Sequence, residues 1–312
     1  MTARPGIVAR LVVVVAMAGL LSGCAGAGVG TGAGTGTGSI STDGRVGVVA
    51  TTTLLADLVA QVGGDHVRVV SLVPKGGEVH TFDPRPSDLV KVDEAQLIVM
   101  NGLGLDDWLA RMATNVGTRA PVVALGPGLP GATYIAGDDG RPNPHLWMNV
   151  AYASAYVSRI EAALTTVDPA HATAYAAAAD AYRARLATLD GWVRQRIASI
   201  PEGDRAFVSF HDALPYYAAA YGLKVVGVVV PAPGQEPSAG EVASLVAAIR
   251  VAGVHAVFSE AQFAPTLAAA LASEAGASVV ADLYTDALGD PPVDTYEGLI
   301  RFDTDRFVEA LR

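Results

Sequence analysis

The sequence predicts an α/β protein with two α/β lobes, each built on a parallel sheet, joined by one long backbone helix. Short apolar strands alternate with helical segments between residues 45 and 125, a pattern typical of βαβ units. The same alternation returns between residues 206 and 311. Between the two series, residues 169–199 are rich in Ala, Leu and Arg, which favours an uninterrupted helix.

The 312 residues suffice for two packed domains. We expect an N-terminal lobe over residues 45–167, a linking helix over 168–200 and a C-terminal lobe over 201–312. Asp168 is suited to the N-cap of the linking helix, with Pro169 at its first position. A helix of about 30 residues would be about 45 Å long.

Within each lobe, runs of Val, Ile and Leu bounded by polar or glycine-containing segments predict the strands. The expected strands of the N-terminal lobe are residues 45–50, 66–73, 97–100 and 122–125. One expected helix of this lobe begins at residue 54, and two others cover residues 86–93 and 106–113. The expected strands of the C-terminal lobe are residues 206–210, 223–230, 256–259 and 278–283, and its helices are 212–221, 238–252, 264–274 and 295–311.

Residues 1–23 have the features of a secretory signal peptide. A positively charged start is followed at residues 11–21 by the apolar run LVVVVAMAGLL, which is too short to span a bilayer comfortably. Residues 21–24, Leu-Ser-Gly-Cys, resemble a bacterial lipobox, which implies cleavage before Cys24 and lipidation of its thiol. The alternative is a plain transmembrane anchor with a chance cysteine.

Residues 24–44 are rich in Gly, Thr and Ser and cannot bury enough apolar surface to order the backbone. We interpret them as a flexible tether that spans about 20–25 Å. Together with a lipid anchor at Cys24, the tether would hold the folded body at the outer, extracytoplasmic face of the bacterial cell membrane.

The composition excludes several functions. The formal net charge is −10 and no basic cluster occurs, so nucleic acid is not an expected partner. A single cysteine excludes an intrachain disulfide and any CxxC metal or redox motif. A metal site in this chain must therefore use His, Asp or Glu.

Four candidate ligands follow predicted strands, two in each lobe. His80 follows the second strand, His145 the fourth, His211 the fifth and Asp286 the eighth. In open α/β sheets, ligands bind beyond the carboxyl ends of the strands, so a cleft between the lobes could bring these side chains together. The other three histidines are interpreted as surface or structural residues: His66, His171 and His255.

At these residues the chain resembles the metal-binding lipoproteins of bacterial ABC importers for zinc and manganese. The similar segments are Leu72-Val73-Pro74 through His80-Thr81-Phe82-Asp83-Pro84, Pro86-Ser87-Asp88, Asn101-Gly102-Leu103-Gly104-Leu105 with Trp108-Leu109, Asn143-Pro144-His145-Leu146-Trp147, Phe210-His211-Asp212-Ala213 and Tyr284-Thr285-Asp286-Ala287-Leu288. The resemblance covers nearly all of the chain after Cys24. It implies a helical-backbone metal receptor that is not an enzyme, in which His80, His145, His211 and Asp286 coordinate the metal.

The chain departs from the family pattern at three places. Asn143 stands where family members often have Asp, residues 148–150 are not the common continuation, and Ala261 replaces a frequent proline. These positions neighbour the four implied ligands without replacing any of them.

Three imidazoles and one carboxylate suit Zn²⁺, the favoured cargo, whereas oxygen ligands suit Mn²⁺, the next candidate. Manganese-selective relatives often carry Glu at the position of His211. Four protein ligands also favour carriage over hydrolysis, because catalytic zinc usually keeps a water. The expected partners are an ABC importer permease and, through Cys24, the membrane, and a monomer is expected.

Three other functions are compatible with parts of the sequence. A lipid-anchored zinc hydrolase could use the same ligands with Glu260 or Glu236 as general base. A surface adhesin, active in cell adhesion, is compatible with an anchored binding protein. A receptor for an iron chelate or a vitamin would leave the three candidate histidines without a role.

Overall fold

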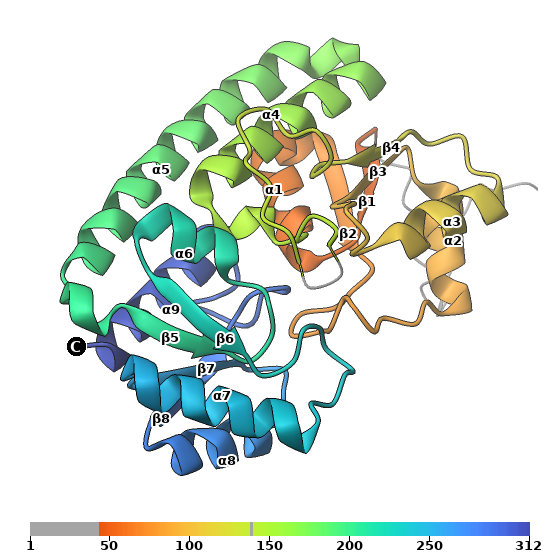
Figure 1. The fold of residues 1–312 in the computed structure, drawn as a ribbon. Helices are drawn as coiled ribbons and strands as arrows, with labels where there is room; N and C mark the ends of the chain where they lie inside the picture. The colour runs from red at the N-terminus through yellow and green to blue at the C-terminus, as the bar shows by residue number, and fades with distance from the viewer. Residues whose placement is uncertain (1–43, 138–139) are drawn as a thin grey trace, which may run out of the picture. The chain divides into compact units, whose positions relative to one another are not determined.

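The computed structural model describes residues 44–137 and 140–312. The predicted signal peptide, Cys24 and all of the predicted tether except its last residue lie outside the described residues. The described chain has two lobes, each with a four-stranded parallel sheet (Figure 1). The predicted fold class is therefore confirmed.

The N-terminal sheet has the order β2-β1-β3-β4. Its strands are β1 (Val46–Ala50), β2 (Val67–Ser71), β3 (Leu97–Met100) and β4 (Val122–Ala124). Because side chains alternate along a strand, β1 faces two cores. Val48 packs with α1 (Thr53–Gly63) and α4 (Val150–Val167), whereas Val49 packs with α2 (Pro86–Glu94) and α3 (Asp107–Val116).

The C-terminal sheet repeats this order as β6-β5-β7-β8. Its strands are β5 (Ala206–Ser209), β6 (Lys224–Val228), β7 (Ala256–Glu260) and β8 (Ser278–Leu283). Val208 packs with α7 (Ala239–Ala252) and α8 (Thr266–Ala275). On the other face, Phe207 packs with α6 (Pro215–Tyr221) and α9 (Tyr296–Ala310).

The helix α5 (Ala172–Ala198) runs along both lobes (Figure 1). At 1.5 Å per residue its 27 residues span about 40 Å. Its buried residues recur every three or four positions, as expected of one face of a helix: Tyr175, Ala179, Tyr182, Leu186, Leu189, Val193 and Ile197. They belong to a single apolar core with residues of α1, α4, α6 and α9, so α5 joins the two lobes.

The structure corrects the sequence-based elements in several places. The helix α4 was not predicted. Residues 169–171 form a 3₁₀ turn ahead of α5, so the long helix begins three residues later than expected. His66 ends a 3₁₀ turn before β2 instead of beginning that strand. Residues 212–214 are a loop, and α6 begins at Pro215, which lacks the backbone N–H that a helix interior needs.

No helix within residues 44–137 and 140–312 is both long enough and apolar enough to cross a membrane.

Candidate metal centre

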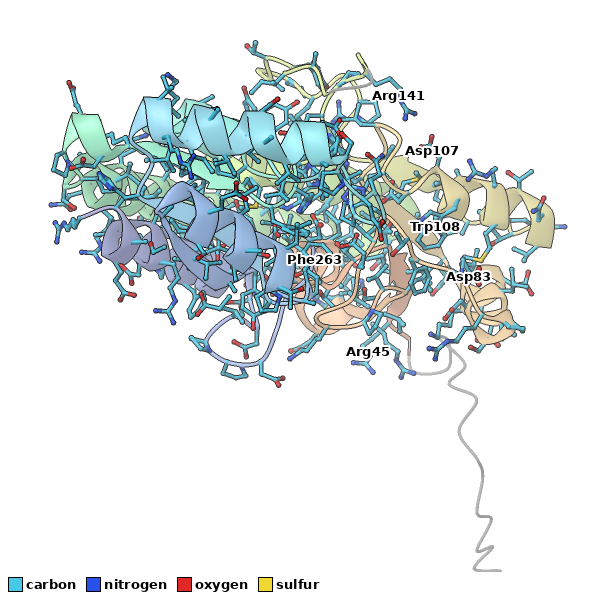
Figure 2. All side chains as sticks on the ribbon, turned by 60° about the horizontal axis from the view of Figure 1, so that its bottom comes forward. Arg45, Asp83, Asp107, Trp108, Arg141 and Phe263 are labelled. Atoms are coloured by element: carbon cyan, nitrogen blue, oxygen red, sulfur yellow. The ribbon has the colours of Figure 1, made fainter. Side chains whose placement is uncertain are left out.

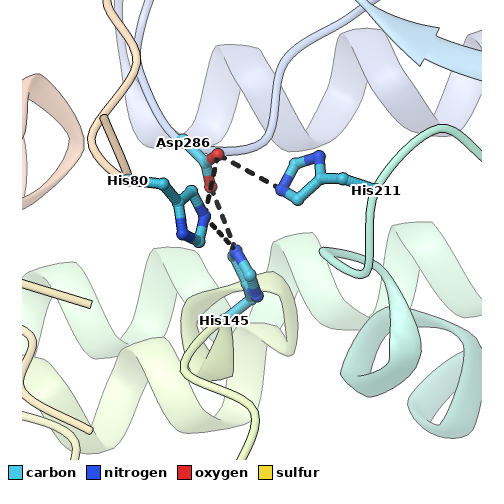
Figure 3. Close-up of side chains that lie close together, drawn as sticks. All are labelled: His80, His145, His211 and Asp286. Carbon is cyan, nitrogen blue, oxygen red and sulfur yellow. Dashed lines mark hydrogen bonds and ion pairs between the residues drawn. The ribbon is translucent and has the colours of Figure 1, made fainter. Parts of the chain in front are cut away.

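The four side chains predicted as metal ligands lie together between the lobes (Figure 3). His80 comes from the loop between β2 and α2, and His145 directly precedes the 3₁₀ turn Leu146–Met148 that leads into α4. His211 lies two residues beyond β5, and Asp286 lies three residues beyond β8. Each lobe thus contributes two residues, from loops at the carboxyl ends of parallel strands, as that topology predicts.

The shortest distances between the side chains are close to the edge of a coordination tetrahedron, and one ligand atom from each of the four residues lies within 4.8 Å of the others. Zinc binds His nitrogen and carboxylate oxygen at about 2.0–2.2 Å, which places tetrahedral ligand atoms about 3.4 Å apart. The Nε2 atoms of His80 and His145 are 3.3 Å apart. Asp286 Oδ2 lies 3.3 Å from His211 Nε2 and 3.7 Å from His80 Nε2, and Asp286 Oδ1 lies 3.4 Å from His145 Nε2. One ion of this size can therefore touch all four residues.

The centre is almost closed to solvent. His145, His211 and Asp286 are buried, and 16% of the His80 side chain is exposed. A cavity of about 370 Å³ reaches His80 and His145, with Leu103, Arg141, Asp212 and Gln235 among its lining residues. Figure 2 shows Arg141 on the loop ahead of His145. This cavity provides a route for a small ion to the imidazoles.

Several buried polar atoms of the centre lack hydrogen-bond partners. Neither carboxylate oxygen of Asp286 nor Nε2 of His211 has one in the part of the chain that the structure describes. A buried carboxylate without hydrogen bonds is costly unless a cation compensates its charge. A divalent ion at the centre would supply that compensation for Asp286 and accept the lone pairs of the imidazoles.

Electrostatics distinguish the histidines. Burial lowers the pKa of His80 to about 3, so this imidazole stays neutral at physiological pH. Burial also opposes charge on His211, but the carboxylates of Glu260 and Asp286 outweigh it and hold the pKa of His211 well above its usual value. Burial raises the pKa of Asp286, whereas the positive charge of His211 holds it well below the normal range. In the metal-free protein, His211 therefore carries a proton next to an ionised Asp286.

Two buried residues contact the Nδ1 atoms of the imidazoles. Glu260 Oε1 lies 2.7 Å from Nδ1 of His211, and Asn143 Oδ1 lies 2.9 Å from Nδ1 of His145. Partners of this kind fix the tautomer and orientation of metal-binding histidines. This role of Glu260 was not predicted from the sequence, although Glu260 ends β7 at the same edge of the sheet as the ends of the neighbouring strands.

The two residues considered as general bases of a hydrolase are not placed to activate a metal-bound water. Glu260 lies on the Nδ1 side of His211, whereas Nε2 of His211 is the atom that faces the centre. Glu236 is exposed on the loop after β6. Phe263, labelled in Figure 2, packs its ring edge-on against His211 and further encloses it.

The other three histidines lie outside the centre. His66 and His171 stack with their ring centroids 4.0 Å apart, and His171 pairs with Asp168 at 2.6 Å. The side chain of His255 is 63% exposed and lies 3.5 Å from Asp204. Their surroundings agree with surface or structural roles.

Hydrogen bonds between the lobes join the loops that carry the candidate ligands. The indole N–H of Trp147 donates to the carbonyl of Thr285 at 2.7 Å, joining the neighbours of His145 and Asp286. The hydroxyl of Tyr296 donates to the carbonyl of Trp147 at 2.7 Å, and the backbone N–H of Tyr296 donates to Asp57 at 2.9 Å. These three hydrogen bonds therefore join the two lobes next to the centre.

Comparisons with known proteins identify the family of the chain. Residues 48–310 match the family described as zinc-uptake complex component A, periplasmic. The chain is 31% identical to the manganese-binding lipoprotein MntA of Halalkalibacterium halodurans, over 87% of this chain and 90% of that protein. It is 32% identical to the iron-binding protein YfeA of Yersinia pestis, over 84% of this chain and 85% of that protein.

The solved structure of the periplasmic zinc-binding protein TroA from Treponema pallidum is also similar. It superposes with a TM-score of 0.78 at 27% identity, covering 85% of this chain and 98% of TroA. The family consists of substrate-binding proteins of transporters and not of enzymes, as expected for this chain. The chain therefore belongs to the zinc-uptake component A family of metal-binding, substrate-binding proteins of ABC transporters.

Proposed function

We propose that this chain captures one divalent metal ion outside the cytoplasmic membrane, with zinc preferred over manganese, and passes it to the permease of an ABC importer. The observation that carries the proposal is the convergence of three Nε2 atoms and one buried carboxylate at distances that suit a single ion. The ligands are His80, His145, His211 and Asp286. The ion is the transported cargo.

The preference for zinc rests on the donor atoms. Three imidazoles with one carboxylate suit Zn²⁺, whereas Mn²⁺ is better served by oxygen donors. The names of the relatives span manganese, iron and zinc and therefore do not select one metal. Four protein ligands fill a tetrahedral site, which suits carriage of the ion.

We also propose that residues 1–23 direct export, that Cys24 is lipidated and that residues 24–44 tether the body to the membrane, where it acts as a monomer. The lipobox-like residues 21–24 support this anchor, as does the description of the relative MntA as a lipoprotein. A tethered body would stay close to the importer permease.

Elemental analysis and competition titration of the purified chain test the metal preference. We expect one zinc per chain, and we expect zinc to displace manganese when both are supplied equally. A preference for manganese would keep the carrier role and contradict the choice of zinc. A chain that binds neither ion would contradict the proposal.

Zinc accumulation by cells tests delivery. In cells that lack their own copy, the wild-type chain should restore uptake from zinc-poor medium, whereas a His145→Ala variant should not. The matched control is His171→Ala, because His171 lies outside the centre. Equal uptake with wild type and His145→Ala would contradict delivery through this site.

Zinc binding at pH 7 is expected to release at least one proton, because the metal must displace the proton held on His211. His80, with its pKa lowered to about 3, is already neutral and releases none. Each displaced proton lowers the apparent affinity about tenfold per unit fall in pH. Calorimetry in buffers of different ionisation enthalpy measures the proton count, and zero protons with unchanged affinity down to about pH 5 would contradict this electrostatic account.

A further inference from the structure

Asn143 is a buried amide between the two ligand loops that face each other across the lobe boundary. Asn143 is 3% exposed. Its side chain contacts both His145 and Asp212, which directly follows His211. We propose that Asn143 is a positioning residue that presents Nε2 of His145 to the metal and ties that imidazole to the His211 loop. This inference rests on the proposed metal carriage.

The surroundings of Asn143 fix the orientation of its amide. Its Nδ2 lies 2.7 Å from the carbonyl oxygen and 2.9 Å from the Oδ2 of Asp212, both of which are acceptors. Its Oδ1 lies 3.0 Å from the backbone N–H of His145, which can only donate. A flipped amide would set its NH₂ group against that N–H and its oxygen against the acceptors of Asp212. The oxygen of Asn143 therefore faces His145.

This orientation determines the tautomer of His145. Nδ1 of His145 lies 2.9 Å from Asn143 Oδ1, which can only accept, so Nδ1 must carry the hydrogen. Nε2 is then the nitrogen with the free lone pair. It faces the centre, 3.3 Å from His80 Nε2 and 3.4 Å from Asp286 Oδ1. A neutral histidine in this tautomer can bind the ion without rearrangement.

The same amide makes the geometry of His145 depend on the other lobe. Both Nδ2 hydrogens of Asn143 are used on Asp212, which follows β5 of the C-terminal lobe. The hydroxyl of Tyr216 on α6 donates to the backbone carbonyl oxygen of Asn143 at 2.9 Å. His211, in contrast, has Glu260 of its own lobe at Nδ1. A change in the lobe contact at Asp212 would thus act on His145 and leave the partner of His211 in place.

Two substitutions separate the functions of the amide. Asn143→Leu keeps the approximate size and removes all four side-chain hydrogen bonds. Asn143→Asp keeps an acceptor for His145 but loses the donors to Asp212. The matched control is Asn149→Ala, because Asn149 lies on the same segment and its side chain caps α4 by accepting a hydrogen bond from the backbone N–H of Ala151.

Nitrogen-15 NMR of the His145 ring in the metal-free protein reports the tautomer, and competition titration reports zinc affinity. Asn143→Leu should lose the single Nδ1–H tautomer and bind zinc about 10- to 100-fold more weakly, the usual loss for a partner of a metal ligand. Asn143→Asp should keep the tautomer, and Asn149→Ala should change neither readout.

An unchanged tautomer and affinity in Asn143→Leu would overturn the inference. If that variant does not fold, loss of the Nδ1–H tautomer in folded Asn143→Asp would overturn it. A wild-type protein that binds no zinc would contradict the proposed function instead, and the tautomer measurement in the metal-free protein would still test the role of Asn143.

Discussion

Replacing His211 by alanine is expected to weaken zinc binding by more than about 100-fold, which is the upper end of the loss for a residue that only supports a ligand. The variant lacks one of the four proposed ligands and opens a buried position at the centre. Competition titration against a chelator of known affinity measures the change. Zinc affinity within tenfold of wild type would exclude His211 as a ligand.

The same variant should also lower the free energy of unfolding of the metal-free protein. Protonated His211 lies against two buried carboxylates, Glu260 and Asp286. Removing one partner of a buried ionic contact typically costs about 3–5 kcal/mol. Because the pKa of His211 is raised on folding, this stabilisation is fully present below the unfolded pKa of about 6.5 and is lost as pH rises through the folded pKa.

Thermal and denaturant unfolding at pH 6 with a chelator present therefore measure the loss of stability. His255→Ala is the matched control, because its side chain is mostly exposed, and it should change neither stability nor zinc affinity appreciably. A His211→Ala variant as stable as wild type at pH 6 would contradict the ionic contact.

Replacing Asp286 by asparagine is expected to weaken zinc binding strongly. The amide keeps the shape of the side chain but removes the negative charge that compensates the ion, so zinc affinity should fall more than about 100-fold, again beyond the loss for a supporting residue. The metal-free protein should also lose stability, because the charge of His211 holds the pKa of Asp286 well below its usual range and the ionised carboxylate therefore contributes to folding stability.

The measurement is the shift in unfolding temperature on adding zinc. A ligand at 100 times its Kd stabilises the folded state by about 2.7 kcal/mol, and Asp286→Asn should lose most of that gain. Asp282→Asn is the matched control, because Asp282 lies on the same strand, is 44% exposed and pairs with Arg306. An undiminished zinc-induced shift in Asp286→Asn would remove Asp286 from the proposed ligands.

Much of the fold could be predicted because buried parallel strands are short apolar runs and α5 contains no proline and only one glycine, Gly191. The helix α4 was missed, although Asn149 caps it and its buried residues, from Val150 through Ile160 to Leu164, recur at helical spacing. The start of α6 was predicted at residue 212, three residues too early, although Pro215 marks the first position of the helix. Residues 212–214 form the loop beyond His211, and local helix propensity does not reveal that loop.

The four central side chains could be named because each follows a strand and matches a family segment. Their supporting contacts could not, because they join residues far apart in sequence. Glu260 lies 49 positions from His211, and Asn143 lies 69 positions from Asp212. Such pairs depend on how the two lobes pack, which strand and helix patterns do not encode. Asn143 could be recognised only as a departure from the family pattern.

The central claim is that one ion binds to all four side chains at once. A crystal structure of the zinc-loaded protein, with anomalous data collected at the zinc edge, tests it most directly. We predict one strong peak between the lobes, about 2.0–2.2 Å from Nε2 of His80, His145 and His211 and from a carboxylate oxygen of Asp286. A zinc-loaded crystal with no peak there, or with its peak at another site, would contradict the account.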